Sequence, residues 1–346
     1  MNITVIQKEY EEIIVKCILN FIRPQGIILY GGYGRNEGSW IFKNGEKPKP
    51  YNDFDILLVV TKEISSNLVN EIKKSIKSHI PIRWIDLSQI KTRKLKKLKN
   101  SIYNYDLKYA SKILYGNEKL QSYISNLKST TIPLKEIDTL FKTRVWTLMG
   151  CFEDNSFDEI SGTSSMFFRN QMAKSVLASV DCCLLLKRQY HYSYKQRIKI
   201  FLKDYNESEY FELACWALEE KLRPQDYDMS KSEVKEMFSK VANFFIKSFF
   251  IGLSKYYKQT IKNEVDIEKV YLYTTKNFLK RKVQNLMNSS GDYNAYMIIL
   301  QFLCVSYLLN KDERTLKRIQ VLSKKIDICD ESFEEIRKQI ALLRLS

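Results

Sequence analysis

The sequence predicts an α+β fold, with an N-terminal domain of mixed sheet and helices at residues 1–130 and an all-helical C-terminal domain at residues 131–346. Seven of the eleven glycines lie before residue 117 and five of the six prolines lie before residue 134, so turns concentrate in the first third. Beyond Pro133, apolar residues repeat at helical spacing almost throughout. A chain of 346 residues, 45% of them hydrophobic, can build a core in each part.

In the first part, short apolar runs rich in β-branched residues alternate with helical patterns. The runs predict strands at residues 26–30, 53–61 and 82–87, and the helical patterns predict helices at 10–21 and 65–79. A further helix, ending near Gly116, is predicted from apolar residues three and four apart: Leu95, Leu98, Ile102, Tyr105 and Tyr109. An α/β or α+β domain follows from this alternation.

The second part is expected to form a helical bundle. Its predicted helices are residues 134–151, 165–188, 207–221, 231–259, 266–288, 293–309 and 331–344. No fixed-period repeat links them, which excludes a solenoid.

The net charge of +16 makes polyanions such as nucleic acid or nucleotide phosphates expected partners. A lysine-rich composition explains the same charge without any binding role, so both interpretations stay open. The seven cysteines form no CxxC pair, which favours free thiols in a reducing compartment, and we expect a cytoplasmic protein. The longest apolar stretch, residues 295–309, is shorter than a membrane span of roughly 20 residues, so no membrane contact is expected.

The most informative stretch is IILYGGYGRNEGSW, followed by YNDFDILLVV. Gly31 and Gly32 directly follow the first predicted strand, where glycines permit a tight turn and let backbone N–H groups approach a phosphate. The stretch matches neither a Walker A motif nor a dinucleotide-binding fingerprint.

Two aspartates open the second strand of this stretch. Asp53 and Asp55 are two residues apart, so their side chains share one face of a strand, about 6.5 to 7 Å apart at the backbone. Carboxylates so placed suit Mg²⁺, which prefers oxygen ligands. Asp86, between Ile85 and Leu87 in the next strand, must point out of the apolar layer and is the candidate third carboxylate that lets two ions bind.

This combination resembles the polymerase-β-like nucleotidyltransferase superfamily. Its wording GGYGRNE is especially similar to the catalytic domains of PII uridylyltransferase and glutamine synthetase adenylyltransferase. The resemblance covers roughly residues 26–116. It implies transfer of a nucleoside monophosphate from an NTP, with ATP the expected nucleotide, to a hydroxyl group, with two Mg²⁺ ions and release of pyrophosphate.

The resemblance also implies roles for individual residues. Asp53, Asp55 and Asp86 would be catalytic and bind the metal ions, with Asp86 helping to activate the acceptor hydroxyl. Nucleotide contacts are implied for a larger set, namely Gly31, Gly32, Arg35, Ser39, Lys174 and Tyr194. For three of these an alternative stays open: Arg35 as a brace of the turn, Lys174 as a solvated helix residue, and Tyr194 as part of a packed corner of the bundle.

The sequence departs from the family pattern in two ways. The segment IFKNGEKPKPYN lengthens the gap between the glycines and Asp53 as an expected loop, so Gly38-Ser39 is a second alignment for the phosphate turn. Neither histidine is followed by aspartate, so the His-Asp phosphohydrolase domain of the PII-modifying enzymes is missing and their biology does not transfer.

The acceptor therefore stays open between a protein side chain, a small molecule such as an aminoglycoside, and an RNA 3′ end. The basic run from Lys91 to Lys99 favours either RNA or a solvated helix face. Two other functions are kept as alternatives. One is a nucleotide-sugar glycosyltransferase that uses Asp53-Phe54-Asp55 for its metal, and the other is a basic RNA-binding module with a vestigial site.

Overall fold

The computed structural model describes residues 2–43, 45–51, 53–205, 209–283, 290–330 and 332–343, with the backbone alone at 274–283 and 290–292. The chain divides into two compact units. The first consists of Met1–Pro133, Lys187–Asn206 and Leu218–Gln225, and the second of Leu134–Leu186, Glu207–Ala217 and Asp226–Ser346. A small mixed sheet and many helices make up an α+β fold, as predicted. A domain boundary at residues 130/131 stays a prediction.

A four-stranded sheet forms the centre of the first unit, in the order β5-β4-β1-β6. The strands are β1 (Gly26–Tyr30), β4 (Phe54–Val60), β5 (Ile85–Lys91) and β6 (Lys112–Gly116). β1 pairs antiparallel with β4 and β6, whereas β4 and β5 are parallel, so the sheet is mixed. Within the segment expected to be a loop, β2 (Trp40–Ile41) and β3 (Lys49–Pro50) pair as a second, two-stranded sheet.

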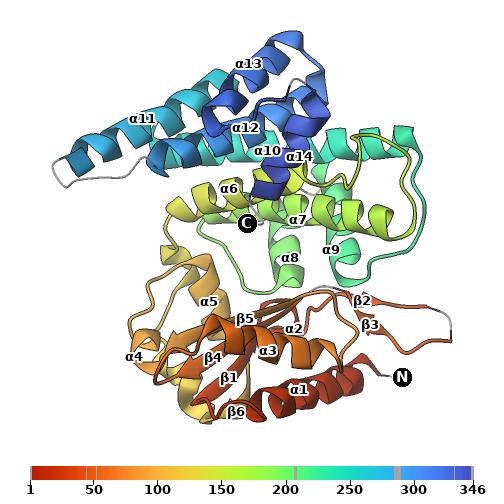
Figure 1. The fold of residues 1–346 in the computed structure, drawn as a ribbon, viewed down its shortest axis with the longest axis vertical. Coiled ribbons are helices and arrows are strands. Elements are labelled where there is room, and N and C mark those ends of the chain that lie inside the picture. The colour runs from red at the N-terminus through yellow and green to blue at the C-terminus, as the bar shows by residue number, and fades with distance from the viewer. Residues whose placement is uncertain are drawn as a thin grey trace. The chain divides into compact units, whose positions relative to one another are not determined.

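One face of the four-stranded sheet packs against α1 (Ile3–Leu19) and α3 (Ser66–Lys77), which lie side by side (Figure 1). Alternate residues of the strands, such as Ile27 and Leu29 or Phe54 and Ile56, enter the core between this face and the two helices. Because successive side chains of a strand point to opposite faces, Asp55 and Asp86 belong to the other face. The sheet therefore separates the hydrophobic core from the predicted carboxylates.

The prediction of one helix running to Gly116 is wrong. The structure has two short helices, α4 (Thr92–Leu95) and α5 (Ile102–Tyr109), and the last residues form strand β6. Ser101 caps α5 by accepting a hydrogen bond from the backbone N–H of Asn104 at 3.1 Å. Pairing of β6 with β1, which lies about 85 residues earlier in the chain, overrides the local helical spacing.

Further short elements complete the first unit: α2 (Gly31–Gly34), the 3₁₀ turns Glu118–Tyr123 and Ser129–Thr131, and α8 (Tyr194–Tyr205). The sequence did not predict α8. Two charged side chains from elsewhere in this unit hold its first turn, as described below.

The second unit is helical in the described residues, apart from an isolated bridge between Ile160 and Met229. Its helices are α6 (Lys135–Met149), α7 (Gly162–Leu186), the first part of α9 (Tyr210–Leu222), α10 (Lys231–Tyr257), α11 (Glu264–Val283), α12 (Ser290–Asn310), α13 (Glu313–Ser323) and α14 (Phe333–Leu343). Of these, only α13 was not predicted. The predicted helix 266–288 extends past residue 283, and that extension lies outside the described residues.

Aromatic rings fill the centre of the second unit. Phe141 of α6 packs against Phe245 and Phe249 of α10, with ring centroids 5.8 and 5.7 Å apart. One described helical segment, Tyr293–Asn310, is long and apolar enough to cross a membrane, with mean hydropathy 1.2. Since 61% of it is buried inside the protein, as is usual for core helices, it is weak evidence for a membrane span.

Candidate active site

Three carboxylates lie at the same end of the neighbouring strands β4 and β5. The parallel register of these strands places Asp55 directly beside Asp86, and Asp53 immediately precedes β4. Asp86 is exposed, while Asp53 and Asp55 are partly buried. The structure thus brings the three predicted carboxylates to one edge of the sheet.

Burial and neighbouring charge act together on the carboxylate of Asp55. Burial, together with the negative charges of Asp53 and Asp86, raises the pKa of Asp55 to about 8. Lys221 and Arg35 act in the opposite direction without cancelling the rise. The same edge holds like charges together, which is the arrangement expected of a site that receives cations.

Two tyrosines border the carboxylates. Tyr30, the last residue of β1, pairs with Asp55 across the ladder, and its ring meets that of Tyr103 edge-on at 5.4 Å. Burial raises the pKa of both hydroxyls, and the charges of Asp55 and Asp86 raise it further. Both phenols therefore stay protonated near neutral pH and can donate hydrogen bonds at this edge.

Gly31 is the residue that allows the turn after β1 to pass beside Asp55. Its φ of +65° lies in the left-handed region, and a Cβ built on it would lie 1.8 Å from Oδ2 of Asp55. The sequence predicts that this glycine makes room for a phosphate. In the structure, the carboxylate of Asp55 occupies the space that a side chain at position 31 would take.

The rest of the turn is anchored in the core through Tyr33. Its ring packs on Phe54 at 4.3 Å, and its hydroxyl donates to the carbonyl of Ser39 at 2.6 Å. Ser39 itself is 1% exposed, and its hydroxyl donates to the carbonyl of Lys221. A role of Ser39 in phosphate binding stays a prediction, since this hydroxyl already serves a contact within the protein.

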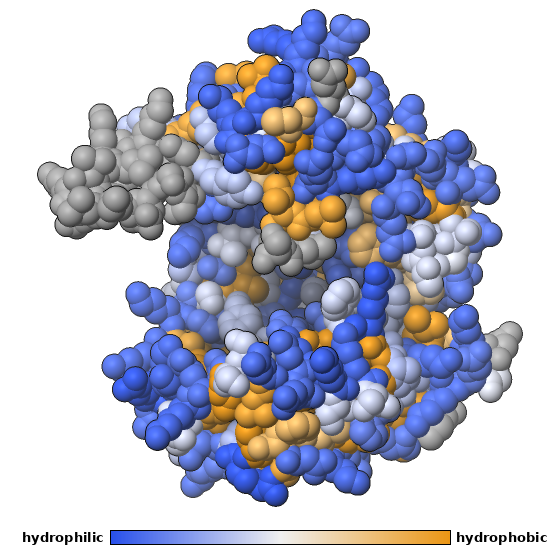
Figure 2. Space-filling view, viewed as in Figure 1, coloured by the Kyte–Doolittle hydropathy of each residue, from blue (hydrophilic) through white to orange (hydrophobic). Residues whose placement is uncertain are grey.

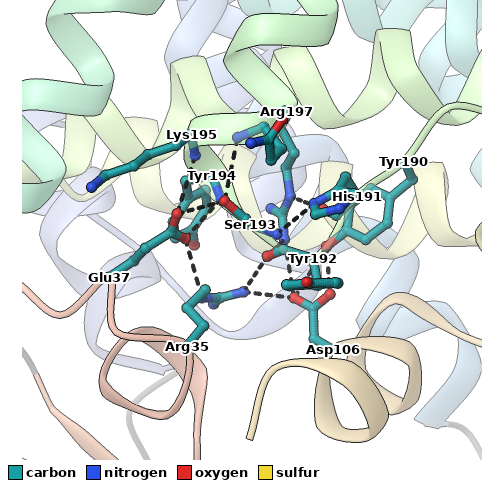
Figure 3. Close-up of polar contacts among 11 residues, drawn as sticks. Arg35, Glu37, Asp106, Tyr190, His191, Tyr192, Ser193, Tyr194, Lys195 and Arg197 are labelled. Atoms are coloured by element: carbon teal, nitrogen blue, oxygen red, sulfur yellow. Dashed lines mark hydrogen bonds and ion pairs between the residues drawn. The ribbon is translucent and has the colours of Figure 1, made fainter.

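A buried charge network joins the turn to α8 (Figure 3). The carboxylate of Asp106 on α5 accepts hydrogen bonds from Arg35 at 2.9 Å, from Arg197 at 3.0 Å and from the hydroxyl of Tyr190 at 3.1 Å. The Arg35 and Arg197 side chains are only 7% and 3% exposed. Arg35 also donates to the backbone carbonyl of Tyr192 at 2.9 Å, so one guanidinium ties three segments together.

Glu37 completes this network at the beginning of α8 (Figure 3). Its carboxylate accepts from the backbone N–H of Tyr194 at 2.8 Å, from that of Lys195 at 3.2 Å and from the hydroxyl of Ser193 at 2.6 Å. A carboxylate at a helix N-terminus satisfies free N–H groups and is favoured by the helix dipole. The GGYGRNE stretch therefore contributes two of the charges that fix α8.

The other predicted nucleotide contacts lie in different surroundings. The ring of Tyr194 lies 4.6 Å from the guanidinium carbons of both Arg35 and Arg197, so it packs against the network. Gly32 lies beside Gly31 in the single-turn helix α2. Lys174 is a half-buried residue of α7, in the second unit. Their contacts with a nucleotide stay predictions.

Sequence reasoning did not find Asp106 or Arg197. These residues stand 71 and 162 positions after Arg35, and nothing in the local pattern pairs them. Sequence reasoning also gave no role to Glu37, although it belongs to the GGYGRNE stretch, which was the available signal.

The donor set at the sheet edge fits a hard divalent cation, because it consists of carboxylate oxygens, which are the ligands that Mg²⁺ prefers. Burial and, after it, the charges of Asp53 and Asp86 raise the pKa of Asp55. Among the described residues, no three His, Cys, Asp or Glu side chains already lie close enough to hold a metal ion together. The carboxylates would have to turn toward a common ion.

No protein-family model matches the sequence, and no curated protein matches it. One solved structure with some likeness is the crystal structure of spectinomycin adenyltransferase AAD(9) from Enterococcus faecialis with ATP and spectinomycin. It has a TM-score of 0.43 and 13% sequence identity, over 67% of this chain and 98% of that chain. A likeness at this level is too weak to assign a fold or a function.

Proposed function

We propose that the chain is a Mg²⁺-dependent nucleotidyltransferase of the polymerase-β-like superfamily. It transfers an NMP from an NTP, with ATP the expected nucleotide, to a hydroxyl group of an acceptor and releases pyrophosphate. The observation that supports this proposal most is the edge formed by Asp53, Asp55 and Asp86, beside a glycine turn that follows the neighbouring strand. No other part of the described chain combines these features.

We assign the three carboxylates different roles according to their positions. Asp55 lies beside the glycine turn, and with Asp53 it would hold both Mg²⁺ ions, whereas the exposed Asp86 would hold one ion and face the acceptor. When bound, Mg²⁺ offsets the negative charge of the triphosphate and of the leaving pyrophosphate. Asp86 can accept the proton that the acceptor hydroxyl gives up.

The proposed reaction is a single displacement at the α-phosphorus of the NTP. The acceptor oxygen forms a bond to the α-phosphorus, and the bond from this phosphorus to the bridging oxygen of the β-phosphate breaks. The electron pair leaves with pyrophosphate, and the hydroxyl proton passes to Asp86. Tyr30 and Tyr103, both protonated, can donate hydrogen bonds to oxygens at this edge.

We assign Arg35 to bracing the turn, because its guanidinium already bonds Asp106 and the carbonyl of Tyr192. Gly31 and Gly32 are proposed to lie next to the triphosphate. For Lys174 and Tyr194 the proposed nucleotide contacts rest on the resemblance alone. The seven cysteines, all free thiols, suit the proposed location in the reducing cytoplasm.

The test is to incubate the purified chain with each α-labelled NTP, Mg²⁺ and a cell lysate, and to measure pyrophosphate and label on protein, RNA and small molecules. We expect pyrophosphate release that stops when EDTA removes the metal. Asp53→Asn and Asp55→Asn should each lower the rate at least about 1,000-fold, or about 4 kcal/mol in activation free energy, while the fold survives.

Asp204→Asn serves as the matched control, because Asp204 is an aspartate of the same unit whose carboxylate pairs with Lys187 at the surface. It should keep the wild-type rate. Turnover of sugar nucleotides without pyrophosphate would instead favour the glycosyltransferase, and RNA binding with no turnover of any nucleotide would favour the vestigial site. Wild-type rates in both site variants at saturating Mg²⁺ would exclude the metal assignment.

A further inference from the structure

Trp84 is a large aromatic residue that the protein leaves in solvent. It is 61% exposed and lies directly before β5, two residues from Asp86. Two residues of extended chain span about 7 Å, so the ring begins within the reach of one nucleotide from the proposed acceptor-side carboxylate. β5 is the outer strand of the sheet, which leaves this edge accessible within the first unit.

Two cations lie beside the ring of Trp84. Nζ of Lys77, the last residue of α3, is 5.3 Å from the ring centroid, and the guanidinium carbon of Arg83 is 5.7 Å from it. Each cation is attracted to the face of the ring. Lys74, one turn before Lys77 on α3, is also exposed, so positive charge continues away from the ring.

A second exposed ring lies near the carboxylates. Tyr103 is 46% exposed and meets Tyr30 edge-on, and the charges of Asp55 and Asp86 contribute to the raised pKa of its hydroxyl. The acceptor side of the edge therefore presents exposed aromatic surface near Asp86 and, around Trp84, positive charge. Most of the face drawn in Figure 2 is hydrophilic, with smaller hydrophobic areas between the polar residues.

Stacking rings with adjacent cations are the features that bind single-stranded nucleic acid. A base stacks on the ring, and the neighbouring cations bind the phosphates. An uncharged sugar would gain nothing from Lys77 and Arg83, and a cationic small molecule would be repelled by them. The charge and the aromatic surface together favour an anionic ligand with flat rings.

We propose that Trp84, Lys77 and Arg83 form a docking platform for the end of a single nucleic-acid strand, and that this strand is the acceptor. The terminal base stacks on Trp84, Lys77 and Arg83 bind its phosphates, and the 3′ hydroxyl lies next to Asp86. This assignment of the acceptor rests on the proposed function, whereas the binding itself does not.

The experiment measures binding of a fluorescent 12-nucleotide single-stranded RNA to the full chain by anisotropy, in EDTA and without NTP, so that no transfer occurs. Trp84→Ala should weaken binding about 5- to 150-fold, since one stacked base contributes about 1–3 kcal/mol. Trp84→Phe should retain most of the affinity. The double change Lys77→Gln with Arg83→Gln should lower the slope of log affinity against log salt by about 1.4, or about 0.7 for each lost phosphate contact.

Matched controls come from the second unit. Tyr273 is also 61% exposed, so Tyr273→Ala removes an equally accessible ring. Lys231→Gln with Lys240→Gln removes two exposed lysines of α10. Both controls should bind the RNA as the wild type does. Equal RNA affinity in wild type and Trp84→Ala, or equal losses in Trp84→Ala and Tyr273→Ala, overturns the platform.

Transfer is then measured separately with α-labelled NTP and Mg²⁺. The platform is supported as the acceptor site if the wild-type protein transfers label to the RNA, and if this label is absent when the RNA ends in a 3′-deoxy nucleotide. Loss of RNA affinity in Trp84→Ala, without pyrophosphate release from any NTP by the wild type, overturns the proposed function while the binding platform holds. Label on a small molecule or protein, with unchanged RNA affinity in Trp84→Ala, overturns the platform and leaves the transfer in place.

Discussion

Two groups of charged side chains in the first unit differ in how their charges are balanced. Around Asp106, one carboxylate serves two nearly inaccessible guanidinium groups, those of Arg35 and Arg197, at hydrogen-bond distance. At the sheet edge, burial and then the negative charges of Asp53 and Asp86 instead raise the pKa of a third carboxylate, Asp55. The first group pairs opposite charges, and the second keeps like charges together.

The difference separates a structural role from a functional one. The Asp106 network connects the turn after β1, helix α5 and helix α8, and each bond in it stabilises the folded unit. Burial of Asp55 beside two like charges works against folding, and arrangements of this kind are concentrated at functional sites. A divalent cation between the carboxylates would turn the repulsion into attraction.

The largest effect on stability is expected from Asp106→Ala. The change removes the carboxylate that Arg35 and Arg197 share and leaves both guanidinium groups buried, which costs about 3–5 kcal/mol. Urea unfolding followed by circular dichroism measures the loss.

Asp204→Ala is the control for that experiment, because Asp204 pairs with Lys187 in the same unit but with both side chains about 40% exposed. This change should cost less than about 1 kcal/mol. Similar losses for the two variants would mean that the Asp106 network contributes no more to the stability of the unit than an exposed ion pair does.

The second prediction joins the two groups at the glycine turn. Gly31→Ala places a residue with Cβ at φ +65° and brings that Cβ against the carboxylate of Asp55. We expect a loss of about 1–2 kcal/mol from the backbone conformation, and in addition a fall in nucleotide transfer because Asp55 must move.

Gly45→Ala tests the backbone contribution alone, since Gly45 has φ +78° and nothing lies within 4 Å of the position that a Cβ would take there. It should lose a similar backbone free energy in urea unfolding and keep its transfer rate. If Gly31→Ala transferred NMP as fast as Gly45→Ala does, the close approach of residue 31 to the Asp55 carboxylate would not matter for transfer.

The sequence predicts the positions of the three carboxylates at the sheet edge better than it predicts the Asp106 network, because neighbouring residues determine those positions. A period of two places Asp53 and Asp55 on one face, and a charged residue between Ile85 and Leu87 must leave the apolar layer. Strand β1 has the predicted bounds of residues 26–30. Here the neighbours along the chain already decide the geometry.

Elements that depend on distant partners cannot be found from local patterns. Residues 112–116, which follow the helical spacing of residues 95–109, become strand β6 through pairing with β1. Helix α8 depends on Glu37, which precedes it by more than 150 residues and caps its first turn. The pairing of Arg35 with Asp106 and Arg197 likewise arises only in the folded unit.

A third prediction concerns the stability cost at the sheet edge. The pKa of Asp55 is about 8 in the folded protein, above the usual value of 3.8, so the folded state binds a proton that the unfolded state has lost. Stability must therefore fall as the pH rises from about 4 to about 8. In EDTA, Asp55→Asn should have a higher melting temperature than the wild type at pH 8, and the gap should close near pH 4.

The size of the gap follows from the burial and repulsion of the charged carboxylate that the variant removes, at roughly 2–4 °C for each kcal/mol. Added Mg²⁺ provides the control, because it should raise the melting temperature of the wild type and leave that of Asp55→Asn unchanged. A variant that is less stable than the wild type at pH 8 in EDTA would show that the carboxylate is not under repulsion.

The smallest effect is expected at the rim of the network, from His191. Its Nδ1 accepts a hydrogen bond from the backbone N–H of Ser193 at 3.0 Å. Burial and the positive charge of Arg197 lower the pKa of His191, although Glu37 and Asp106 act in the opposite direction. A lowered pKa means that the unfolded state binds the proton more readily, so this group loses its contribution to stability as the pH falls below about 6.5.

His191→Gln should remove this part of the pH dependence. Protonation of Nδ1 ends its role as an acceptor, and one hydrogen bond contributes about 0.5–1.5 kcal/mol, so the free energy of unfolding at pH 8 minus that at pH 5 should shrink by at most that amount. His79→Gln, at the other histidine of the chain, is the control. If the substitution of His79 changed the pH dependence of the free energy of unfolding and that of His191 did not, His191 would not be the group that responds to acid.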